Sequence, residues 1–489
     1  KTAERATRVL MAVRRINISY KNTFNLSVPG FLPNVGDMFG QRSGGGLAPG
    51  LDFAFGLADE GYIAKAVERG WLYCSDSIVT PAASSQTEDF QIKATLEPWP
   101  SVKLDLSASH NRNKSQSIQY MFEGMPTNQT GSFTMTTISI GSAFEGVGSA
   151  SNGYRSATFT KFLGLLDKYR AKAEARYAGA VYPAGTALAG QEYDAANGAV
   201  NQYASEVMIP AFLEAYTGNK DSDIFPSIAA ILPNWNFTYS GLSKLSFMKD
   251  VFRSFNINHG YKSVYNVGSY SSFSSYKEYT SGIGFVTDVA TGNPVPSCPF
   301  DISTVSINES FSPLIGVDMT FHNGITAKAE YRKTRVITLS MTSQQLTETH
   351  SNDFVIGMGY KIADLKLFQP KRKVRRIKSK SVSRDEDGET KASGSKTNAS
   401  GFSQDMNIRL DISFRNQSAI GRDIIMQRSE ATSGNKAVQI SLSADYAFSK
   451  FVTFTAYYDR QFNEPLLTSS SYPTTTQDFG VTVKFKLSR

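Results

Sequence analysis

The stretch from Phe311 to Ile362 constrains the fold most, because its apolar residues recur at every second position. A period of two places alternate side chains on opposite faces of a β-strand. The pattern therefore predicts two antiparallel strands on either side of Asn323-Gly324, each longer than the usual length of about 5 to 6 residues. The apolar positions before that pair are Ile315, Val317, Met319 and Phe321, and those after it are Ile325, Ala327, Ala329, Tyr331, Ile337, Leu339 and Met341.

The turn between these strands sets their register. A two-residue Asn-Gly loop would place each apolar residue opposite a polar one. A three-residue loop over residues 322–324 instead pairs Met319 with Ala327 and keeps the apolar residues on one face. We therefore expect the three-residue loop, with Gly324 at positive φ as part of a bulge.

The second face of this hairpin is charged, since it holds Lys328, Glu330 and Arg332. A soluble antiparallel sheet would solvate that face and bury the other in a packed core. A transmembrane β-barrel would turn the apolar face to lipid and the charged face to an aqueous interior. Both architectures fit the hairpin taken alone.

Composition favours the membrane barrel. The 489 residues include 32 Phe and 23 Tyr but only 3 Trp, mean hydropathy is −0.27, and no segment approaches the roughly 18 consecutive apolar residues of a spanning helix. Strands with one lipid-facing side give such a profile. We expect an all-β chain that forms part of a very large antiparallel transmembrane β-barrel with a helical insertion.

The start of the chain and the two cysteines give weaker indications. Residues 1–15 are charged and lack the apolar centre of a signal peptide, so we expect that one was removed or that the chain is an internal piece. Cys74 and Cys298 lie far apart in loop-like sequence, where they could pair in an oxidising envelope or stay free. No CxxC or histidine cluster indicates a metal, and no cofactor is expected.

The first segment, residues 1–140, is interpreted as barrel strands and loops. Glu97-Pro98-Trp99-Pro100 suits a tight turn between two strands. Strands are expected over 14–28, 51–57, 90–96, 102–108, 118–122 and 133–140, with a short helix over 62–67.

Residues 141–232 break the strand pattern. Apolar residues recur at three and four positions over 156–177, which predicts an amphipathic helix, and a second helix is expected over 199–216, kinked near Pro210 and ended by Gly218. Such an insertion could cap the mouth of the barrel, lie in its lumen, or bind a partner outside it; it could also only fill space.

The strand pattern returns over 233–362 and 404–489, with a possible helical turn at 245–252. If the last strand ends in the periplasm, the turns at 322–324 and 449–451 are periplasmic, and residues 342–352, 416–435 and 463–476 face outward. The charged residues at odd positions of one strand fall on a single face, and that face needs water. They are Asp405, Arg409, Asp411 and Arg415. Closure is needed because an unpaired strand edge in hydrocarbon would cost several kcal/mol per polar group.

The segment 363–403 is a basic and largely disordered loop by its composition, and the same alternation places it in the periplasm. It supplies much of the formal net charge of +8. The basic residues could contact phosphates of the inner leaflet or an acidic periplasmic partner, or the loop could simply be solvated. The candidate patch consists of Lys371, Arg372, Lys373, Arg375, Arg376, Lys378 and Lys380.

Four stretches resemble the C-terminal portion of the SprA/Sov family, the outer-membrane translocon of the type IX secretion system in Bacteroidetes. They are PNWNFTYSGLSKL (233–245), FSPLIGVDMTFHNGITAKAEYRKTR (311–335), QLTETHSNDFVIGMGYKI (345–362) and SSSYPTTTQDFGVTVKF (469–485). The similarity is strongest from about residue 209 onward. Family members are several times longer, which implies that this chain is one segment of a larger barrel in the bacterial outer membrane. The 363–403 loop looks longer than the family leads us to expect.

The resemblance also implies a function. It implies export of folded cargo proteins through a wide lumen, a lateral opening shared with a small PorV-like barrel, and a periplasmic plug protein. The remaining segments of the same barrel and outer-membrane lipids would be further partners, and no nucleic acid is expected.

Two other readings stay open. A self-contained porin or receptor barrel would pair residues 14–28 with 477–487. An outer-membrane hydrolase would need a catalytic group at the rim, and His350, with Glu348 and Asp353 near it in sequence, is the candidate. The sequence favours a protein that is not an enzyme.

Overall fold

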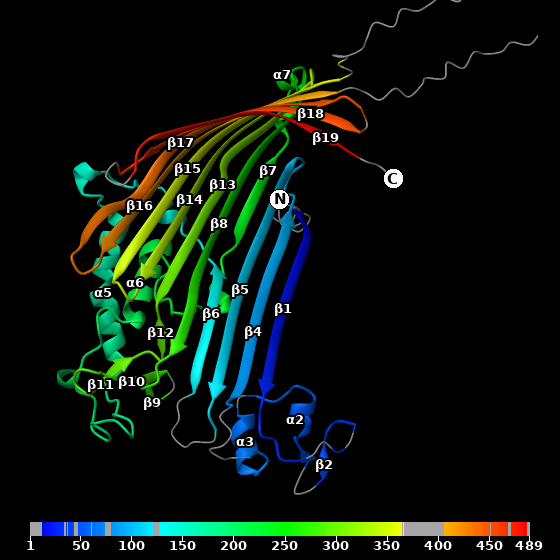
Figure 1. Cartoon of the computed structure of the whole chain (residues 1–489). Coiled ribbons are helices and arrows are strands. Elements are labelled where there is room, and N and C mark those ends of the chain that lie inside the picture. Colours follow the sequence, from blue (N-terminus) through cyan, green and yellow to red (C-terminus); the bar gives the residue numbers. More distant parts are fainter. Residues whose placement is uncertain are drawn as a thin grey trace, which may run out of the picture.

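The computed structural model describes residues 12–486 apart from 34–35, 37, 44–46, 60, 74–79, 121–126, 281, 364, 366–404, 450 and 468–470. One large antiparallel sheet of 14 strands dominates the described residues, and helices lie along one of its faces (Figure 1). The strands follow the order β1-β4-β5-β6-β8-β13-β14-β15-β16-β17-β18-β19, with β7 and β12 beside this path. The predicted antiparallel β-fold with a helical insertion is confirmed.

The strands of the large sheet are long, and β8 alone has 21 residues, or about 70 Å of chain. Their bounds are β1 Val13–Ser27, β4 Ala82–Leu96, β5 Val102–Ile118, β6 Asn128–Thr136, β7 Asn234–Tyr239, β8 Phe252–Ser272, β12 Phe300–Ile302, β13 Thr304–Phe321, β14 Ile325–Ser340, β15 Gln345–Ile362, β16 Met406–Asp423, β17 Arg428–Ala447, β18 Val452–Pro465 and β19 Thr474–Phe485. Two small sheets contain β2 Arg42–Ser43 with β3 Leu47–Ala48, and β9 Lys277–Thr280 with β10 Ile283–Thr287 and β11 Pro294–Ser297.

The helices fall in the connections. They are α2 Leu51–Ala54, α3 Tyr62–Glu68, α4 Ile140–Ala143, α5 Ala157–Ala175, α6 Ser205–Thr217 and α7 Ser246–Lys249, with 3-10 turns at Ala150–Asn152, Ala195–Asn197, Ile228–Ala230 and Leu242–Lys244. Within the described part of the chain, no helix is both long and apolar enough to cross a membrane.

The central hairpin has the predicted register. Met319 pairs with Ala327, Thr320 pairs with Thr326, and Gly324 has φ 85°. The three-residue turn is therefore confirmed, and it keeps the apolar residues of β13 and β14 on one face.

The insertion interrupts one strand of the large sheet and divides it into β6 and β7. β6 pairs with β5 and β8 over their outer halves, and β7 pairs with the same two strands nearer the Trp99 turn. The chain leaves the sheet after Thr136 and returns at Asn234, so two half-strands occupy one position. The side chain of Asn234 accepts a hydrogen bond from the Ser263 backbone N–H at 2.8 Å, and Thr136 Oγ1 accepts one from Ser109 N–H at 3.0 Å. These bonds satisfy donors that the interruption would otherwise leave unpaired.

The two main helices of the insertion form for reasons visible in their sequence. Ser156 caps α5 by accepting a hydrogen bond from Phe159 N–H at 3.1 Å, and Gly218 ends α6 at φ 78°. Pro210 lies inside α6, as expected, but the helix begins at Ser205 rather than near 199. Both helices pack against β8, β13, β14 and β15 in one hydrophobic core; its buried members include Phe162, Leu166, Phe212, Tyr265, Ile307, Ile337 and Leu339.

Several sequence predictions were wrong in their details. Residues 51–57 do not form a strand, because they begin with α2, which packs in a small cluster with α3. The strand expected over 118–122 is only the end of β5, and residues 121–126 lie outside the described part of the chain. Two of the three segments predicted to face outward, 342–352 and 416–435, are mostly strand, because β14 to β17 continue through them and leave turns at 341–344 and 424–427.

Candidate functional site on a two-faced sheet

One face of the sheet has a continuous band of exposed apolar residues. Ile18 on β1 is 66% exposed, Ile315 on β13 is 62% exposed and Phe479 on β19 is 74% exposed. These residues share one face, because the strand pairings keep their alternation in phase from β1 to β19. An exposed apolar surface that runs across a whole sheet requires an apolar surrounding. This is the outer surface of a transmembrane β-barrel wall.

The position of the band gives the tilt of the strands. On β4 the band covers Phe90–Leu96, next to the Trp99 turn, whereas on β17 it covers Val438–Tyr446. Counted along paired residues, it shifts by about one residue for each strand passed, which corresponds to a tilt of about 35°. On β16 the band extends from Met406 to Phe414, or about 22 Å along the membrane normal at that tilt. Transmembrane barrels have similar values, with bands of about 25 Å and tilts of about 35 to 45°.

The opposite face is lined with ion pairs. Lys328 Nζ lies 3.0 Å from Glu330 Oε2, and Arg332 contacts the same carboxylate. Further pairs join Arg415 to Asp353 at 3.0 Å, Arg409 to Asp411 at 2.6 Å and Lys361 to Asp405 at 2.7 Å. The predicted alternation of charges at 405–415 is confirmed. Mixed charges of this kind need water, so this face borders an aqueous space.

The sheet ends at β1 on one side and at β19 on the other. In the described part of the chain, β1 pairs only with β4 and β19 pairs only with β18. The apolar band nevertheless reaches both edge strands, with Tyr20 and Phe485 strongly exposed. Both edges therefore present unpaired backbone groups at the level of the band.

The insertion packs on the same face as the apolar band. It lies past the end of the band that is farther from the turns at 322–324 and 449–451. A buried network at the base fastens it to the sheet. Arg335 lies 2.8 Å from Glu309 and donates hydrogen bonds to the Ser142 backbone oxygen at 2.7 Å and to Ser142 Oγ at 2.9 Å. Glu309 in turn accepts hydrogen bonds from Ser139 Oγ at 2.7 Å and from Tyr261 OH at 2.9 Å. A luminal position for the insertion does not fit this arrangement.

A second buried network ties α6 to β15 and β16. Glu348 accepts hydrogen bonds from Tyr216 OH at 2.6 Å and from Arg422 at 3.1 Å, and the Arg422 side chain is fully buried. Arg422 also donates to the Tyr154 backbone oxygen. The opposite charges and several hydrogen bonds offset the desolvation of the buried groups.

His350 belongs to this second network. It lies in β15 and not in an outer loop, it is buried, and its Nε2 is 3.4 Å from Glu348 Oε2. Asp353 points to the opposite face, where it pairs with Arg415. The structure therefore brings His350 and Glu348 together beneath the insertion and separates both from Asp353, which leaves no open catalytic group at these positions.

Sequence reasoning singled out His350 and Glu348 only as a candidate catalytic site and overlooked Glu309, Arg335 and Arg422, although the network residues leave a signal. Glu309, Arg335, Glu348 and Arg422 share the alternation phase of the apolar residues. A charge in that phase indicates where the outer face stops contacting lipid, because an unpaired charge there would be too costly.

Other candidate residues are placed as follows. All seven basic residues of the 363–403 patch lie outside the described part of the chain, as does Cys74. Cys298 is a free thiol whose burial raises its pKa to about 12, and its sulfur donates to the Phe300 backbone oxygen at 3.2 Å. Among the described residues, no group of three or more His, Cys, Asp or Glu side chains could hold a metal ion.

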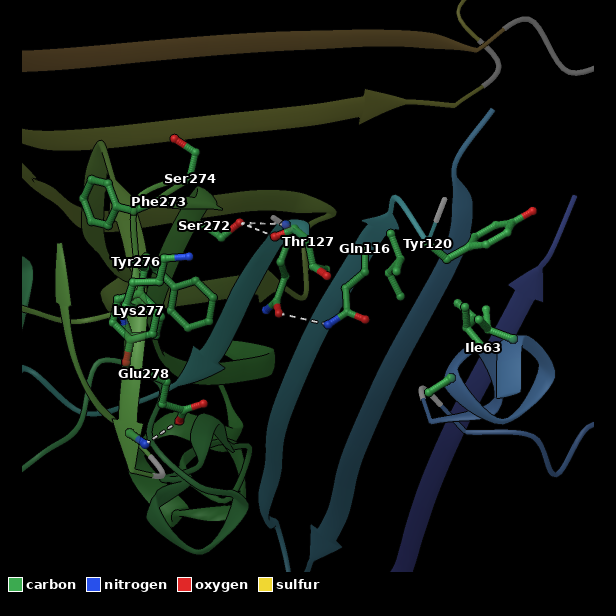
Figure 2. A pocket seen from close by; sticks show the side chains of 17 residues that line it. Ile63, Gln116, Tyr120, Thr127, Ser272, Phe273, Ser274, Tyr276, Lys277 and Glu278 are labelled. Atoms are coloured by element: carbon green, nitrogen blue, oxygen red, sulfur yellow. Dashed lines mark hydrogen bonds between the residues drawn. The ribbon is translucent and has the colours of Figure 1, made fainter. Parts of the chain in front are cut away.

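Two hollows accompany the outer ends of the strands. The larger, of about 1110 Å³, lies between α3 and the β9 segment, and Figure 2 shows Gln116 on its floor with Ile63 and Tyr276 on opposite sides. A second hollow, of about 460 Å³, is lined by residues of α5 and α6. Burial raises the pKa of Glu206 there, while Arg176 opposes the shift. Of the described candidate residues, Cys298 lines the second hollow, whereas Glu348, His350 and Asp353 line neither.

Comparison with known proteins adds little. No protein-family model and no curated protein matches the chain. Among solved structures it is similar to the β-domain of the Bordetella autotransporter Brka, with 6% identity, TM-score 0.22 and coverage of 83% of this chain and 92% of that one. It is also similar to OmpT, an outer membrane protein of Vibrio cholerae, with 8% identity, TM-score 0.20 and coverage of 83% and 93%. An anion-selective porin from Comamonas acidovorans has 8% identity, TM-score 0.11 and coverage of 78% and 82%. Because these TM-scores are low, the likenesses carry no argument about function.

Proposed function

We propose that this chain is one segment of the wall of a large outer-membrane β-barrel that exports folded proteins. The observation on which the proposal rests is that, in the described part of the chain, β1 and β19 each pair on one side only while the apolar band continues onto them. In hydrocarbon each unpaired backbone group costs several kcal/mol, so β1 and β19 need partner strands. Further segments of the same barrel are the partners proposed here.

The placement of the insertion supports a wide conduit. Its helices pack on the apolar face, and none of the helices in the described part of the chain belongs to the ion-paired face. A lumen bordered by that face stays open to large cargo, since lumens widen with strand number. The resemblance to the SprA/Sov family supplies the direction of transport and the proposed partners, namely a PorV-like small barrel, a periplasmic plug and secreted proteins.

Production of residues 1–489 alone, compared with the complete protein, tests the proposal. We expect that the segment alone gives no heat-modifiable, membrane-inserted monomer, whereas the complete protein does. In the complete protein, cysteines placed on β1 and β19 should cross-link to strands outside this chain. A stable barrel formed by the segment alone, with β1 cross-linked to β19, would instead establish a self-contained porin.

A further inference from the structure

The base of the insertion presents an exposed apolar ledge toward the band. We use the name α4 ledge for Ile140, Phe144 and the adjoining Lys333. Phe144 is 57% exposed and Ile140 is 38% exposed, although both belong to a segment that the Arg335 network holds firmly. Exposed apolar residues on so well fixed a segment need an explanation.

The α4 ledge lies at the edge of the apolar band. Lys333 pairs with Phe311, one row beyond the paired residues Ile315 and Tyr331 that end the band on these strands. The Phe144 ring is 5.3 Å from the Phe311 ring. On the neighbouring strand β7, partly buried Trp235 stacks on the buried ring of Tyr261 with the ring centres 4.4 Å apart. Transmembrane barrels concentrate aromatic residues at this level, where hydrocarbon meets headgroups.

The charge at the α4 ledge fits an anionic headgroup. Lys333 Nζ lies 5.0 Å from the centre of the Phe144 ring, and no carboxylate among the described residues forms an ion pair with it. Along the same row, paired residues of successive strands are Asn352, Asn416 and Lys436. This row offers ammonium and amide donors over the four strands from β14 to β17 before it reaches Glu464 on β18, and such donors suit phosphate oxygens.

We propose that the α4 ledge rests on the outer leaflet, with Phe144 and Ile140 in the interfacial layer and Lys333 bound to the phosphate of a lipid headgroup. The inference rests on the proposed barrel wall and on a membrane orientation in which the apolar band faces lipid and the turns at 322–324 and 449–451 are periplasmic. It makes the insertion a membrane-contacting element, fastened to the sheet on one side and supported by lipid beneath.

Lipid quenching of tryptophan fluorescence tests the apolar contact. Phe144→Trp is introduced into the complete, membrane-inserted protein, and the added emission is measured in vesicles of brominated phosphatidylcholine and phosphatidylglycerol. Leu442→Trp, within the band, reports lipid contact, and Val289→Trp, which is fully exposed in the β10–β11 turn, reports water. We expect Phe144→Trp to be quenched at least half as strongly as Leu442→Trp, and most by bromines close to the headgroup.

The outcomes separate the two proposals. If Leu442→Trp is quenched and Phe144→Trp behaves like Val289→Trp, the α4 ledge does not touch lipid and the inference is overturned. If Leu442→Trp itself is not quenched, the membrane orientation fails, and the inference fails with it.

Retention of lipid by the purified protein tests the phosphate contact. Lys333→Gln is compared with Lys328→Gln, which changes a lysine on the ion-paired face. We expect native mass spectrometry with added phosphatidylglycerol to show at least a twofold loss of retained lipid for Lys333→Gln and none for Lys328→Gln. Equal retention of lipid by the two variants would contradict the contact between Lys333 and a lipid phosphate. Displacement of the lipid by free inorganic phosphate would show that Lys333 binds phosphate from either source.

Discussion

At the scale of single residues, the buried charges beneath the insertion matter most. Arg335→Leu would leave Glu309 buried without its partner. We therefore expect the free energy needed to release the insertion from the sheet to fall by about 3 to 5 kcal/mol. Limited proteolysis of the insertion in the membrane-inserted protein measures this loss. Arg332→Leu, on the other face, removes an arginine that is 42% exposed and leaves the buried Glu330 carboxylate paired with Lys328, so it should cost only about 0 to 1 kcal/mol. Equal protease sensitivity of the two variants would contradict a fastening role for Arg335.

Glu206 gives a pH dependence at the same scale. Burial raises its pKa in the folded insertion, so its contribution to stability is complete below about pH 4 and is lost as the pH rises through the raised pKa. Glu206→Gln should therefore be more protease-resistant than the parent at neutral pH, with the difference vanishing in acid. The control is Glu192→Gln, at an exposed carboxylate of the insertion. A pH-independent effect of Glu206→Gln would contradict the expectation.

At the scale of elements, the faces of a single strand can be compared directly. Leu442 lies in the band on β17, and its neighbour Ser441 faces the other way, between Asp411 and Asp459. Leu442→Arg should destabilise the inserted sheet by about 2 to 4 kcal/mol, whereas Ser441→Arg places its charge between two acids and should be close to neutral. Denaturant titration in bilayers measures both changes. A comparable loss for the two variants would mean that the band does not face lipid.

The strands were predictable where the period of two was long and uninterrupted. The 311–341 hairpin, including its turn and register, follows from the sequence because a shift of one residue would exchange its two faces. The short run at 51–57 has the same period but forms α2, since no neighbouring strand pairs with it. The outer halves of β15 and β16 were missed because polar side chains there look like loop residues. Those that face the insertion, such as Glu348 and Arg422, are polar because they take part in its buried network, and local sequence does not contain that contact.

At the scale of the whole molecule, the insertion and the wall are separable parts. β6 and β7 together fill one strand position between β5 and β8. They provide the strand pairing there, so β5 and β8 do not depend on residues 138–232 for it. What the insertion covers is an outer surface that includes Ile307, Ile337 and Leu339. Its removal should therefore expose apolar area on the outside and leave the lumen as it was.

A deletion tests this separation. In the complete protein, residues 138–232 are replaced by a short Gly-Ser linker, and Ile307, Ile337 and Leu339 are changed to Thr so that the uncovered surface tolerates water. We expect the variant to insert and its single-channel conductance to stay within about twofold of the parent, because strand number sets the width of the lumen. The control keeps the insertion and has only the three Thr substitutions. If conductance rises many-fold in the deletion variant alone, the insertion obstructs the lumen, and the outer position derived from the Arg335 and Arg422 networks is wrong.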